Sequence, residues 1–322
     1  MPGARPARWC FPRPYRRPFF SGARAAGRPH RSPGSRSAMH VLSIQSSVAY
    51  GHVGNAAATF PLQRLGHEVW PVATVNYSNH PGFGSYRGGV YHASDVAEIL
   101  DELERRGAFH RCDAILSGFL GAAATGPVLL SAVDRIKRTN PKALYVLDPV
   151  IGDAERGIYV ADGIAEFFRD EALARADIVL PNRYELSLLS GQAAGNDEAA
   201  VRAATSLMER GPSVVVVTGL RHETEISVLL VTARQVWKIT TPLVDIPSHG
   251  AGDTFAALFL GAYFDLQDAR AALDRAVSSM YGVFVATQKL NRDSLALVRA
   301  QMEIVDPSER FAAVPVWADK PE

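Results

Sequence analysis

Residues 248–264 read SHGAGDTFAALFLGAYF, in which two glycines flank one alanine and an aspartate leads directly into an apolar segment. Small residues of this kind pack poorly in a core, but they let a backbone approach another group closely. Such a turn at the start of a helix leaves backbone N–H groups unpaired, and the helix dipole adds positive charge there. The stretch therefore predicts an anion hole, suited to phosphate, at Gly250, Ala251 and Gly252.

Asp253 falls in the first turn of the predicted helix, close to the predicted anion hole. A carboxylate at that place is positioned to accept a proton from a hydroxyl group that attacks a phosphoryl group. The alternative is that Asp253 only caps the helix and the glycines only form a tight turn, and spacing alone does not decide between the two. The lysine of G-x-x-x-x-G-K-[ST] is absent, so the stretch is not a Walker A loop.

Upstream of this stretch, strand-like and helix-like runs alternate along the chain. The strand-like runs are rich in Val, Ile and Leu, as buried parallel strands are. Several helix-like runs begin with Ser, Asn or Asp and end at Gly or Asn, which are capping signals. The strand-like runs are 40–46, 69–75, 113–118, 143–148, 177–181 and 213–219, and the helix-like runs are 55–66, 94–107, 126–140 and 197–211. The alternation predicts a doubly wound α/β fold, with a mostly parallel central sheet flanked by helices on both faces.

The second half of the chain adds a hairpin and a long helical region. Residues 226–232 and 235–240 are both strand-like and are separated by two residues, which predicts an antiparallel hairpin at the edge of the sheet. After the opening stretch the chain is predicted to be helical to about residue 301. Because no repeat or interdomain linker is visible, residues 39–322 are predicted to form a single domain.

Composition places the chain among ordinary globular proteins. It has 322 residues, of which 47% are hydrophobic and 21% are charged. No window approaches 18 uninterrupted apolar residues, so no membrane span is predicted. Cys10 and Cys112 are the two cysteines, too few for a disulfide framework or a zinc cluster. We therefore expect a reducing compartment, the cytoplasm.

Residues 1–38 differ from the rest of the chain. They contain nine arginines and no acidic residue, so the formal net charge of +1 conceals an excess of 33 acidic over 25 basic residues, a net of −8, in the remainder. That balance gives no global electrostatic case for nucleic-acid binding. The segment is rich in Arg, Pro and Gly and has no periodicity, which predicts a disordered or non-native extension. An organelle transit peptide is the alternative, although the prolines break any amphipathic helix.

Polar or glycine residues follow most of the predicted strands. In sheets of this kind ligands bind beyond the carboxyl ends of the strands, so these residues are candidates for one site. For each of them alone turn chemistry is the better explanation, but as a set with residues 248–253 they suggest a site. They are Ser46, Ser78-Asn79-His80, Gly118-Phe119, Asp148, Asn182 and Thr218.

The opening stretch resembles the GxGD signature of the ribokinase-like superfamily. Within that superfamily, residues 43–84 resemble the N-terminal portion of pyridoxal kinases. The same resemblance includes LSGFLG at 116–121, LDPVIGD at 147–153 and LPNRYELSLLSG at 180–191. It extends from about Met39 to Ile304, and the combination of motifs is more specific than GAGD alone.

The resemblance implies a role for each matching residue. Ser46 would hydrogen-bond the pyridine ring of the vitamin, Tyr77 would line or stack against it, and His80 would close the substrate side. Asp253 would act as the base on the hydroxymethyl oxygen, beside the anion hole. The implied substrate-binding set also contains Pro81, Gly82 and Phe119.

The nucleotide side is implied in the same way. Asp148 and Asp153 would lie near the phosphates of ATP, the co-substrate, and their Mg²⁺, whose shell Asn182 and Glu185 would organise. Asp148 and Glu185 would hold the metal through water, since Mg²⁺ prefers oxygen ligands and retains waters. Leu180 and Thr218 would face the nucleotide. Such kinases often need a monovalent cation and form homodimers, although no stretch indicates either.

Two positions depart from the expected family pattern and leave the preferred vitamer open. Pro81 stands where these kinases often have Thr, and Phe119 stands where a Tyr is common. A related branch close to the thiamin-pathway enzymes carries a reactive Cys near the phosphate loop, and neither cysteine of this chain lies there. The polar segment 152–160 predicts either a flap over ATP or an ordinary exposed loop.

Three functions remain as hypotheses. The first is an ATP-dependent pyridoxal kinase of vitamin B6 salvage. The second is a hydroxymethylpyrimidine or sugar kinase, although the short segment between Ser78 and Tyr91 favours a small aromatic substrate over a sugar. The third is a non-catalytic binder of pyridoxal 5′-phosphate, which would need neither a base nor the carboxylates Asp148 and Glu185.

Overall fold

The computed structural model describes residues 38–246 and 249–316. The predicted extension over residues 1–38 lies outside the described residues except for Ala38. The single domain predicted for residues 39–322 remains a prediction.

The centre of the fold is a 10-stranded sheet in the order β12-β11-β10-β9-β8-β5-β4-β1-β2-β3. The central pairs, from β2 through β1, β4, β5 and β8 to β9, are parallel, and the strands at both ends are antiparallel. The predicted α/β class with a mostly parallel sheet is confirmed. The strands are β1 His40–Tyr50, β2 Glu68–Asn79, β3 Gly88–Val90, β4 Ala114–Ser117, β5 Leu144–Leu147, β8 Ile178–Val179, β9 Val214–Arg221, β10 Glu225–Thr232, β11 Val236–Pro242 and β12 Val314–Pro315.

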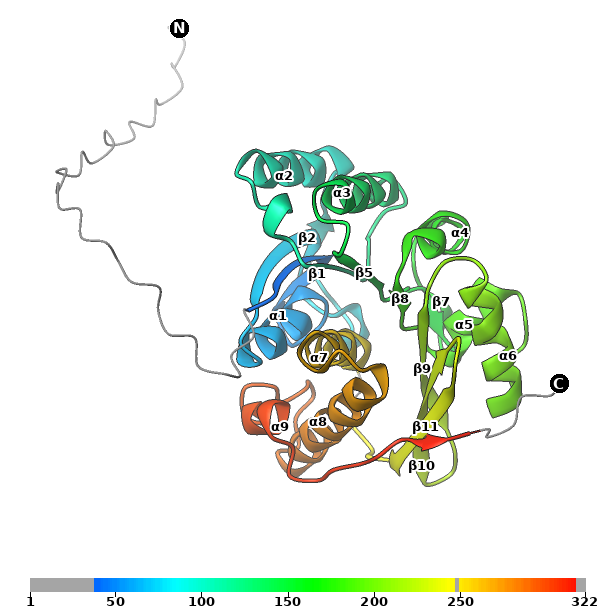
Figure 1. Cartoon of the computed structure of the whole chain (residues 1–322). Helices are drawn as coiled ribbons and strands as arrows, with labels where there is room; N and C mark the ends of the chain where they lie inside the picture. The colour runs from blue at the N-terminus through cyan, green and yellow to red at the C-terminus, as the bar shows by residue number, and fades with distance from the viewer. Residues whose placement is uncertain (1–37, 247–248, 317–322) are drawn as a thin grey trace, which may run out of the picture. The chain divides into compact units, whose positions relative to one another are not determined.

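Helices cover both faces of this sheet (Figure 1). One face carries α1 Asn55–Arg64, α7 Ala251–Leu266, α8 Ala269–Lys289 and α9 Gln301–Val305, and the other carries α2 Ala93–Arg105, α3 Thr125–Thr139, α4 Ile164–Phe167, α5 Arg183–Ser190 and α6 Asp197–Met208. Each layer buries its own apolar core against the sheet. The described part of the chain contains no helix long and apolar enough to cross a membrane.

Short elements complete the fold. A two-stranded hairpin of β6 Gly152–Asp153 and β7 Gly157–Ile158 stands apart from the main sheet. Single turns of other helix types are η1 Pro81–Phe83, η2 Phe109–Arg111, η3 Phe168–Ala172 and η4 Leu173–Arg175. The hairpin occupies the segment predicted as either a flap or a loop, so the segment is ordered β structure.

The hairpin predicted at the sheet edge exists, but its position was wrong. β10 and β11 pair antiparallel as expected, yet β12 adds to the outer side of β11 through Trp237 and Lys238. β12 has only two residues and pairs with a strand far away in the sequence, so no local sequence pattern predicted it. At the opposite edge β3 pairs antiparallel with β2, within the short segment between Ser78 and Tyr91.

Two helix predictions need correction. Asn55 does not cap α1 but is its first residue, and its buried side chain donates to the carbonyls of Gln45 and Val72, which ties β1 to β2. The region predicted to be helical to about residue 301 contains two helices that end at Lys289, and residues 290–300 are not helical. The two helices are separate because Gln267 adopts a left-handed conformation with φ 53° and ends α7. Asp268 then caps α8 by accepting from the Ala271 amide.

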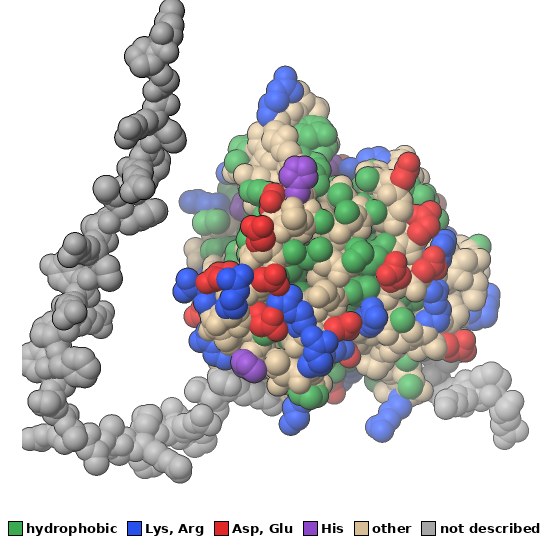
Figure 2. Space-filling view, turned by 90° about the horizontal axis from the view of Figure 1, so that it is seen from above, with side chains coloured by type: hydrophobic (Ala, Val, Ile, Leu, Met, Phe, Trp, Pro, Cys, Tyr) green, Lys and Arg blue, Asp and Glu red, His purple; other side chains and the backbone are tan. Residues whose placement is uncertain are grey.

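The described surface carries charges of both signs. On the face in Figure 2, Asp and Glu side chains lie among Lys and Arg rather than in a patch of one sign. Cys112 is fully buried, as expected for a small apolar side chain.

Candidate active site

One cavity of about 810 Å³ opens beyond the carboxyl ends of the parallel strands. It is bounded by β1 and β2, the β6–β7 hairpin, β9 to β11, and helices α7 and α8. Residues that are far apart in the sequence therefore share one space. Three of the strand-end candidates, Ser78, Asn79 and Gly118, are not among the residues that line it. Its lining contains every residue to which the family resemblance assigns a role: Ser46, Tyr77, His80, Pro81, Gly82, Phe119, Asp148, Asp153, Leu180, Asn182, Glu185, Thr218, Gly250, Ala251, Gly252 and Asp253.

The start of α7 forms an open turn that requires glycine at position 250. Gly250 is the N-cap residue, with φ 82°, and a Cβ there would overlap the carbonyl oxygen of His52. Gly252 is exposed, and the nearest atom to a Cβ added to it is Asp148 Oδ2 at 3.7 Å. The first amides of α7 have no partner within the helix, so they can receive an anion.

Asp253 sits on the third residue of α7 and is half-buried in the cavity wall. Gly250, and not Asp253, is the N-cap residue, although the Asp253 carboxylate accepts from its own amide in the first turn. Burial raises the pKa of the Asp253 carboxyl, and hydrogen bonds from the amides of Gly54 and of Asp253 itself oppose that rise. A carboxyl with a raised pKa is a better proton acceptor near neutral pH.

Asp148, immediately after β5, is a buried acidic group of the cavity, as is Glu185. Asp148 is only 5% exposed, and its Oδ2 has no hydrogen-bond partner. Burial raises its pKa well above the usual range, and the negative charges of Asp253 and Glu185 add to that effect. A buried, unpaired carboxylate oxygen beside the helix turn fits a cation such as Mg²⁺. Within the described residues no three His, Cys, Asp or Glu side chains form a metal cluster, so the remaining ligands would be waters and phosphate oxygens.

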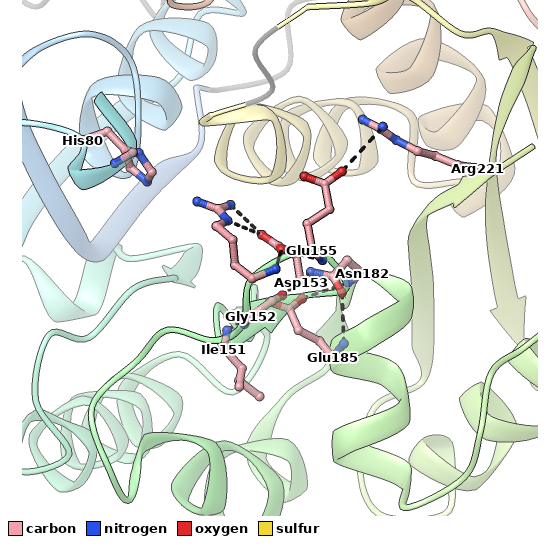
Figure 3. Close-up of polar contacts among 10 residues, drawn as sticks. His80, Ile151, Gly152, Asp153, Glu155, Asn182, Glu185 and Arg221 are labelled. Atoms are coloured by element: carbon pink, nitrogen blue, oxygen red, sulfur yellow. Dashed lines mark hydrogen bonds and ion pairs between the residues drawn. The ribbon is translucent and has the colours of Figure 1, made fainter. Parts of the chain in front are cut away.

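Glu185 and Asn182 form a capping box at the start of α5. Glu185 Oε1 accepts from the amide of Ile151 at 2.9 Å, and Oε2 accepts from the amide of Asn182 at 2.9 Å. Asn182 Nδ2 donates to the Gly152 carbonyl at 2.8 Å (Figure 3). Burial raises the pKa of Glu185 to about 8, although these backbone amides oppose the rise. Both residues thus anchor the β6–β7 hairpin to α5, and a metal would reach Glu185 only through water.

The hairpin brings Asp153 into the cavity together with a residue that the sequence did not single out. Asp153 Oδ2 accepts from Arg156 Nε at 2.8 Å and from a terminal guanidinium nitrogen at 2.5 Å. Burial raises the pKa of Asp153, but these bonds and two backbone amides outweigh it and leave the pKa below its usual value. The only signal for Arg156 was its place as the basic residue of the polar, Gly-flanked segment. It also lies over the Tyr159 ring, 5.0 Å from the centroid.

The substrate side of the cavity is aromatic and carries two imidazoles. His80 and His249 lie with ring centroids 4.3 Å apart, and His80 Nδ1 accepts from the Gly82 amide at 3.0 Å. Burial, His249 and the charge of Arg156 lower the pKa of His80 to about 4. Burial and the charge of Arg156 also lower the pKa of His249. Both rings are therefore neutral at physiological pH, and sequence analysis did not anticipate their contact.

Aromatic rings and small groups complete this side. Tyr77 packs against Tyr86 with centroids 4.9 Å apart, a contact across β2 and the β2–β3 connection that no spacing predicted. Ser46 is 9% exposed. It lies so close to Gly54 that a side chain at position 54 would overlap Ser46. The backbone of Phe119 is fixed by Thr74 Oγ1, which donates to its carbonyl at 2.7 Å.

The far side of the cavity is largely apolar. Leu180 directly follows β8, and Thr218 lies within β9, which extends to Arg221, rather than at its end. Asn182 and Thr218 form a parallel bridge beside them. Apolar side chains from β10, the segment after β11, and α8 face them across the cavity. They include Val228, Leu243, Val244, Ile246, Met280 and Phe284. This wall suits a flat, uncharged ring such as a nucleobase.

Comparison with known proteins decides the family. The sequence profile of the phosphomethylpyrimidine kinase family matches residues 92–296. The pyridoxal kinase PdxY of Rubrobacter xylanophilus is 45% identical over 278 residues, which cover 85% of this chain and 96% of that protein. The pyridoxal kinase PdxY of Corynebacterium diphtheriae is 43% identical over 277 residues, which cover 85% of this chain and 98% of that protein. The chain belongs to the pyridoxal kinase family.

Solved pyridoxal kinases have the same fold. The Leishmania donovani pyridoxal kinase in complex with ADP and pyridoxine is similar with a TM-score of 0.80 and 28% identity, covering 86% of this chain and 99% of that one. The pyridoxal kinase of Entamoeba histolytica, at 24% identity, has a TM-score of 0.81. The predicted membership of the pyridoxal kinase family and the ribokinase-like fold are confirmed.

Proposed function

We propose that this chain transfers the γ-phosphoryl group of ATP to the 5′-hydroxymethyl group of pyridoxal, which gives pyridoxal 5′-phosphate and ADP. One observation carries the proposal: the half-buried carboxylate of Asp253 and the open turn from Gly250 to Gly252 face the same cavity. A base and an anion hole side by side are what phosphoryl transfer to a hydroxyl group requires. The names of the curated relatives support pyridoxal as the acceptor.

In the proposed reaction Asp253 takes the proton of the 5′-hydroxyl group. The hydroxyl oxygen forms a bond to the γ-phosphorus of ATP, and the bond from that phosphorus to the β-γ bridging oxygen breaks, releasing ADP. The amides of Gly250, Ala251 and Gly252 hold the oxygens of the transferring group. Asp148, and Glu185 through water, would hold Mg²⁺, which supplies charge neutralisation for the phosphates when bound.

The two sides of the cavity would position the two substrates. Ser46, Tyr77, His80, Pro81, Gly82 and Phe119 would surround the pyridine ring. Leu180, Asn182 and Thr218 would face the nucleotide along the apolar wall, with Asp153 near its phosphates. A solved relative that contains ADP and pyridoxine together supports one cavity for both ligands. Most of the rate enhancement of such a site comes from holding the hydroxyl oxygen and the γ-phosphorus in line.

The proposal also includes a homodimer in the cytoplasm and a monovalent cation as an activator. Light scattering of the purified chain tests the dimer, and turnover in K⁺ against tetramethylammonium tests the cation. A monomeric, fully active protein would contradict the first, and equal rates in both salts would contradict the second.

The direct test is ATP consumption by the purified protein with Mg²⁺, with pyridoxal, pyridoxine, pyridoxamine, hydroxymethylpyrimidine and ribose offered in parallel. We expect turnover with pyridoxal, and the ranking of the three vitamers shows what Pro81 and Phe119 do. Turnover only with the pyrimidine would favour the function named by the matching family profile. Binding of pyridoxal 5′-phosphate without any turnover would favour a non-catalytic binder.

A further inference from the structure

We propose that Arg156 contacts the γ-phosphate of ATP, exchanging hydrogen bonds to Asp153 for bonds to a phosphate oxygen. This inference rests on the proposed function and adds a phosphate-binding residue to it. The arginine lies on the turn of the β6–β7 hairpin, and its guanidinium group holds Asp153 with the two-pronged geometry that also fits a phosphate.

The charge of the cavity calls for a cation at this place. Asp148, Glu185 and Asp253 line the cavity, and ATP brings further negative charge into it. Among the described residues that line the cavity, the only Lys or Arg side chains are Arg156 and Arg221. Arg221 pairs at 4.0 Å with Glu155, whose side chain is 83% exposed, so that pair lies at the solvent side of the hairpin (Figure 3).

Arg156 lines the same cavity as the two imidazoles of His80 and His249 and the turn at Gly250. Its charge lowers the pKa of His249, which immediately precedes Gly250, and that of His80, which lies against His249. His80 and Arg221 stand on opposite sides of the hairpin in Figure 3. The guanidinium group of Arg156 therefore binds Asp153 and brings its charge close to both imidazoles, in the cavity whose wall includes the turn from Gly250 to Gly252.

The hairpin allows the exchange of partners. Its base is fixed, since Asn182 Nδ2 donates to the Gly152 carbonyl and Glu185 Oε1 accepts from the Ile151 amide. Its turn is exposed, and the Arg156 side chain retains 46% of its solvent exposure. An exposed ion pair of this kind is weak, so a phosphate can replace Asp153 without a large energetic cost.

The alternative is that Arg156 only braces the hairpin by holding Asp153. A brace would support all nucleotides equally, whereas a γ-phosphate contact distinguishes ATP from AMP. The test is to measure the dissociation constants of ATP, ADP and AMP by calorimetry for wild type, Arg156→Gln and Arg156→Lys, together with kcat and KM for ATP. Circular dichroism and thermal unfolding establish that each variant is folded.

We expect Arg156→Gln to weaken ATP binding about tenfold or more, as loss of a charge-assisted contact does, and to change the binding of ADP and AMP, which lack the γ-phosphate, less than twofold. Arg156→Lys keeps the charge but cannot donate two parallel hydrogen bonds, so its affinity for ATP should lie between those of wild type and Arg156→Gln. The matched control is Arg221→Gln, which removes the same charge from the same cavity and should change ATP binding less than twofold.

Equal effects of Arg156→Gln on ATP and AMP, or no effect on either, would overturn the inference. An equal loss of ATP binding in Arg221→Gln would also overturn it, because general attraction of charge would then explain both. The binding measurements do not require turnover. If the wild type failed to phosphorylate pyridoxal, the proposed function would be wrong. The nucleotide affinities would still show whether Arg156 contacts the γ-phosphate.

Discussion

Individual glycines decide whether the turn before α7 can receive a phosphate. Gly250 has a left-handed backbone, and a Cβ there would overlap the backbone of His52, whereas a Cβ on Gly252 would meet only Asp148 Oδ2 at 3.7 Å. The fold therefore requires glycine at position 250. At position 252 the fold has room for a Cβ atom, so the small size of Gly252 leaves space for a ligand. The two positions make opposite predictions.

We predict that Gly250→Ala destabilises the protein by roughly 1–3 kcal/mol, through backbone strain and overlap, while Gly252→Ala leaves stability within about 1 kcal/mol. Gly252→Ala should nevertheless lower kcat at least about tenfold, since its methyl group would take space beside the anion hole that phosphate oxygens need. Thermal unfolding and ATP turnover measure the two effects. Gly66→Ala, at φ 93° with nothing within 4 Å, is the control for strain without overlap. Full activity of Gly252→Ala would contradict the assigned role.

His80 provides a prediction about pH. Its pKa of about 4 in the folded protein lies below its usual value of 6.5, because burial, His249 and Arg156 disfavour the charged ring. Below pH 6.5 the unfolded chain therefore binds a proton that the folded protein does not, and stability falls until about pH 4. His80→Asn retains an acceptor for the Gly82 amide but removes this titration. We expect its melting temperature to rise relative to wild type as the pH is lowered from 7.5 to 5. A difference that does not change with pH would show that His80 is not the group responsible.

At the scale of elements, the start of α5 links the fold to the nucleotide side of the cavity. The Asn182 side chain accepts from the amides of Tyr184 and Glu185 and donates to the Gly152 carbonyl, so one residue caps the helix and holds the hairpin. Asn196 caps α6 in the same way, by accepting from the Ala199 amide, but is not among the residues that line the cavity.

These two caps form a matched pair for mutation. We predict that Asn182→Ala and Asn196→Ala each lower stability by roughly 0.5–2 kcal/mol, as loss of an N-cap does. Only Asn182→Ala should raise KM for ATP, because it also releases the hairpin that carries Asp153 and Arg156. Chemical denaturation and steady-state kinetics separate the two effects. If both variants kept the wild-type KM, the hairpin would not contribute to nucleotide binding.

Elements with strong local patterns were predictable from the sequence, and those made by distant contacts were not. The runs at 40–46, 69–75 and 213–219 became β1, β2 and β9, because buried parallel strands need long apolar runs. β12 depends on pairing with β11 across the chain, and the break at Gln267 depends on a left-handed residue other than glycine. β12 leaves no local signal, whereas the break after Gln267 leaves one in Asp268, the N-cap of α8.

The site divides in the same way. The predicted residues lie at strand ends and at one helix start, and topology alone brings such positions together. The contacts between His80 and His249 and between Asp153 and Arg156 depend on how loops fold over the sheet. Motif spacing therefore located the cavity and His80 but did not identify Arg156 or the contact between His80 and His249.

At the scale of the whole molecule, the cavity is lined by parts of the fold that are far apart in the sequence. Its walls come from the β1–β2 end of the sheet, from β9 to β11, and from α7 and α8 on one face. A ligand that touches all of these walls stabilises the folded state as a whole.

We predict that ATP with Mg²⁺ at about 100 times its dissociation constant stabilises the protein by about 2.7 kcal/mol, which raises the melting temperature by a few degrees. Tripolyphosphate carries the negative charge of ATP but no nucleobase. It should give a smaller shift in melting temperature at the same concentration, because it cannot contact the apolar side chains of the cavity. Differential scanning calorimetry measures both. An equal shift with the two ligands would show that the apolar wall does not hold the nucleobase.

The central claim is that Asp253 is the base in phosphoryl transfer from ATP to pyridoxal. The most direct measurement is kcat for Asp253→Asn with pyridoxal, ATP and Mg²⁺, alongside the affinity of the variant for pyridoxal. The asparagine keeps the shape of the side chain and removes the proton acceptor. We predict that kcat falls by at least about 10², with pyridoxal affinity within about threefold of the wild-type value and the fold intact. Wild-type turnover by Asp253→Asn would contradict the claim.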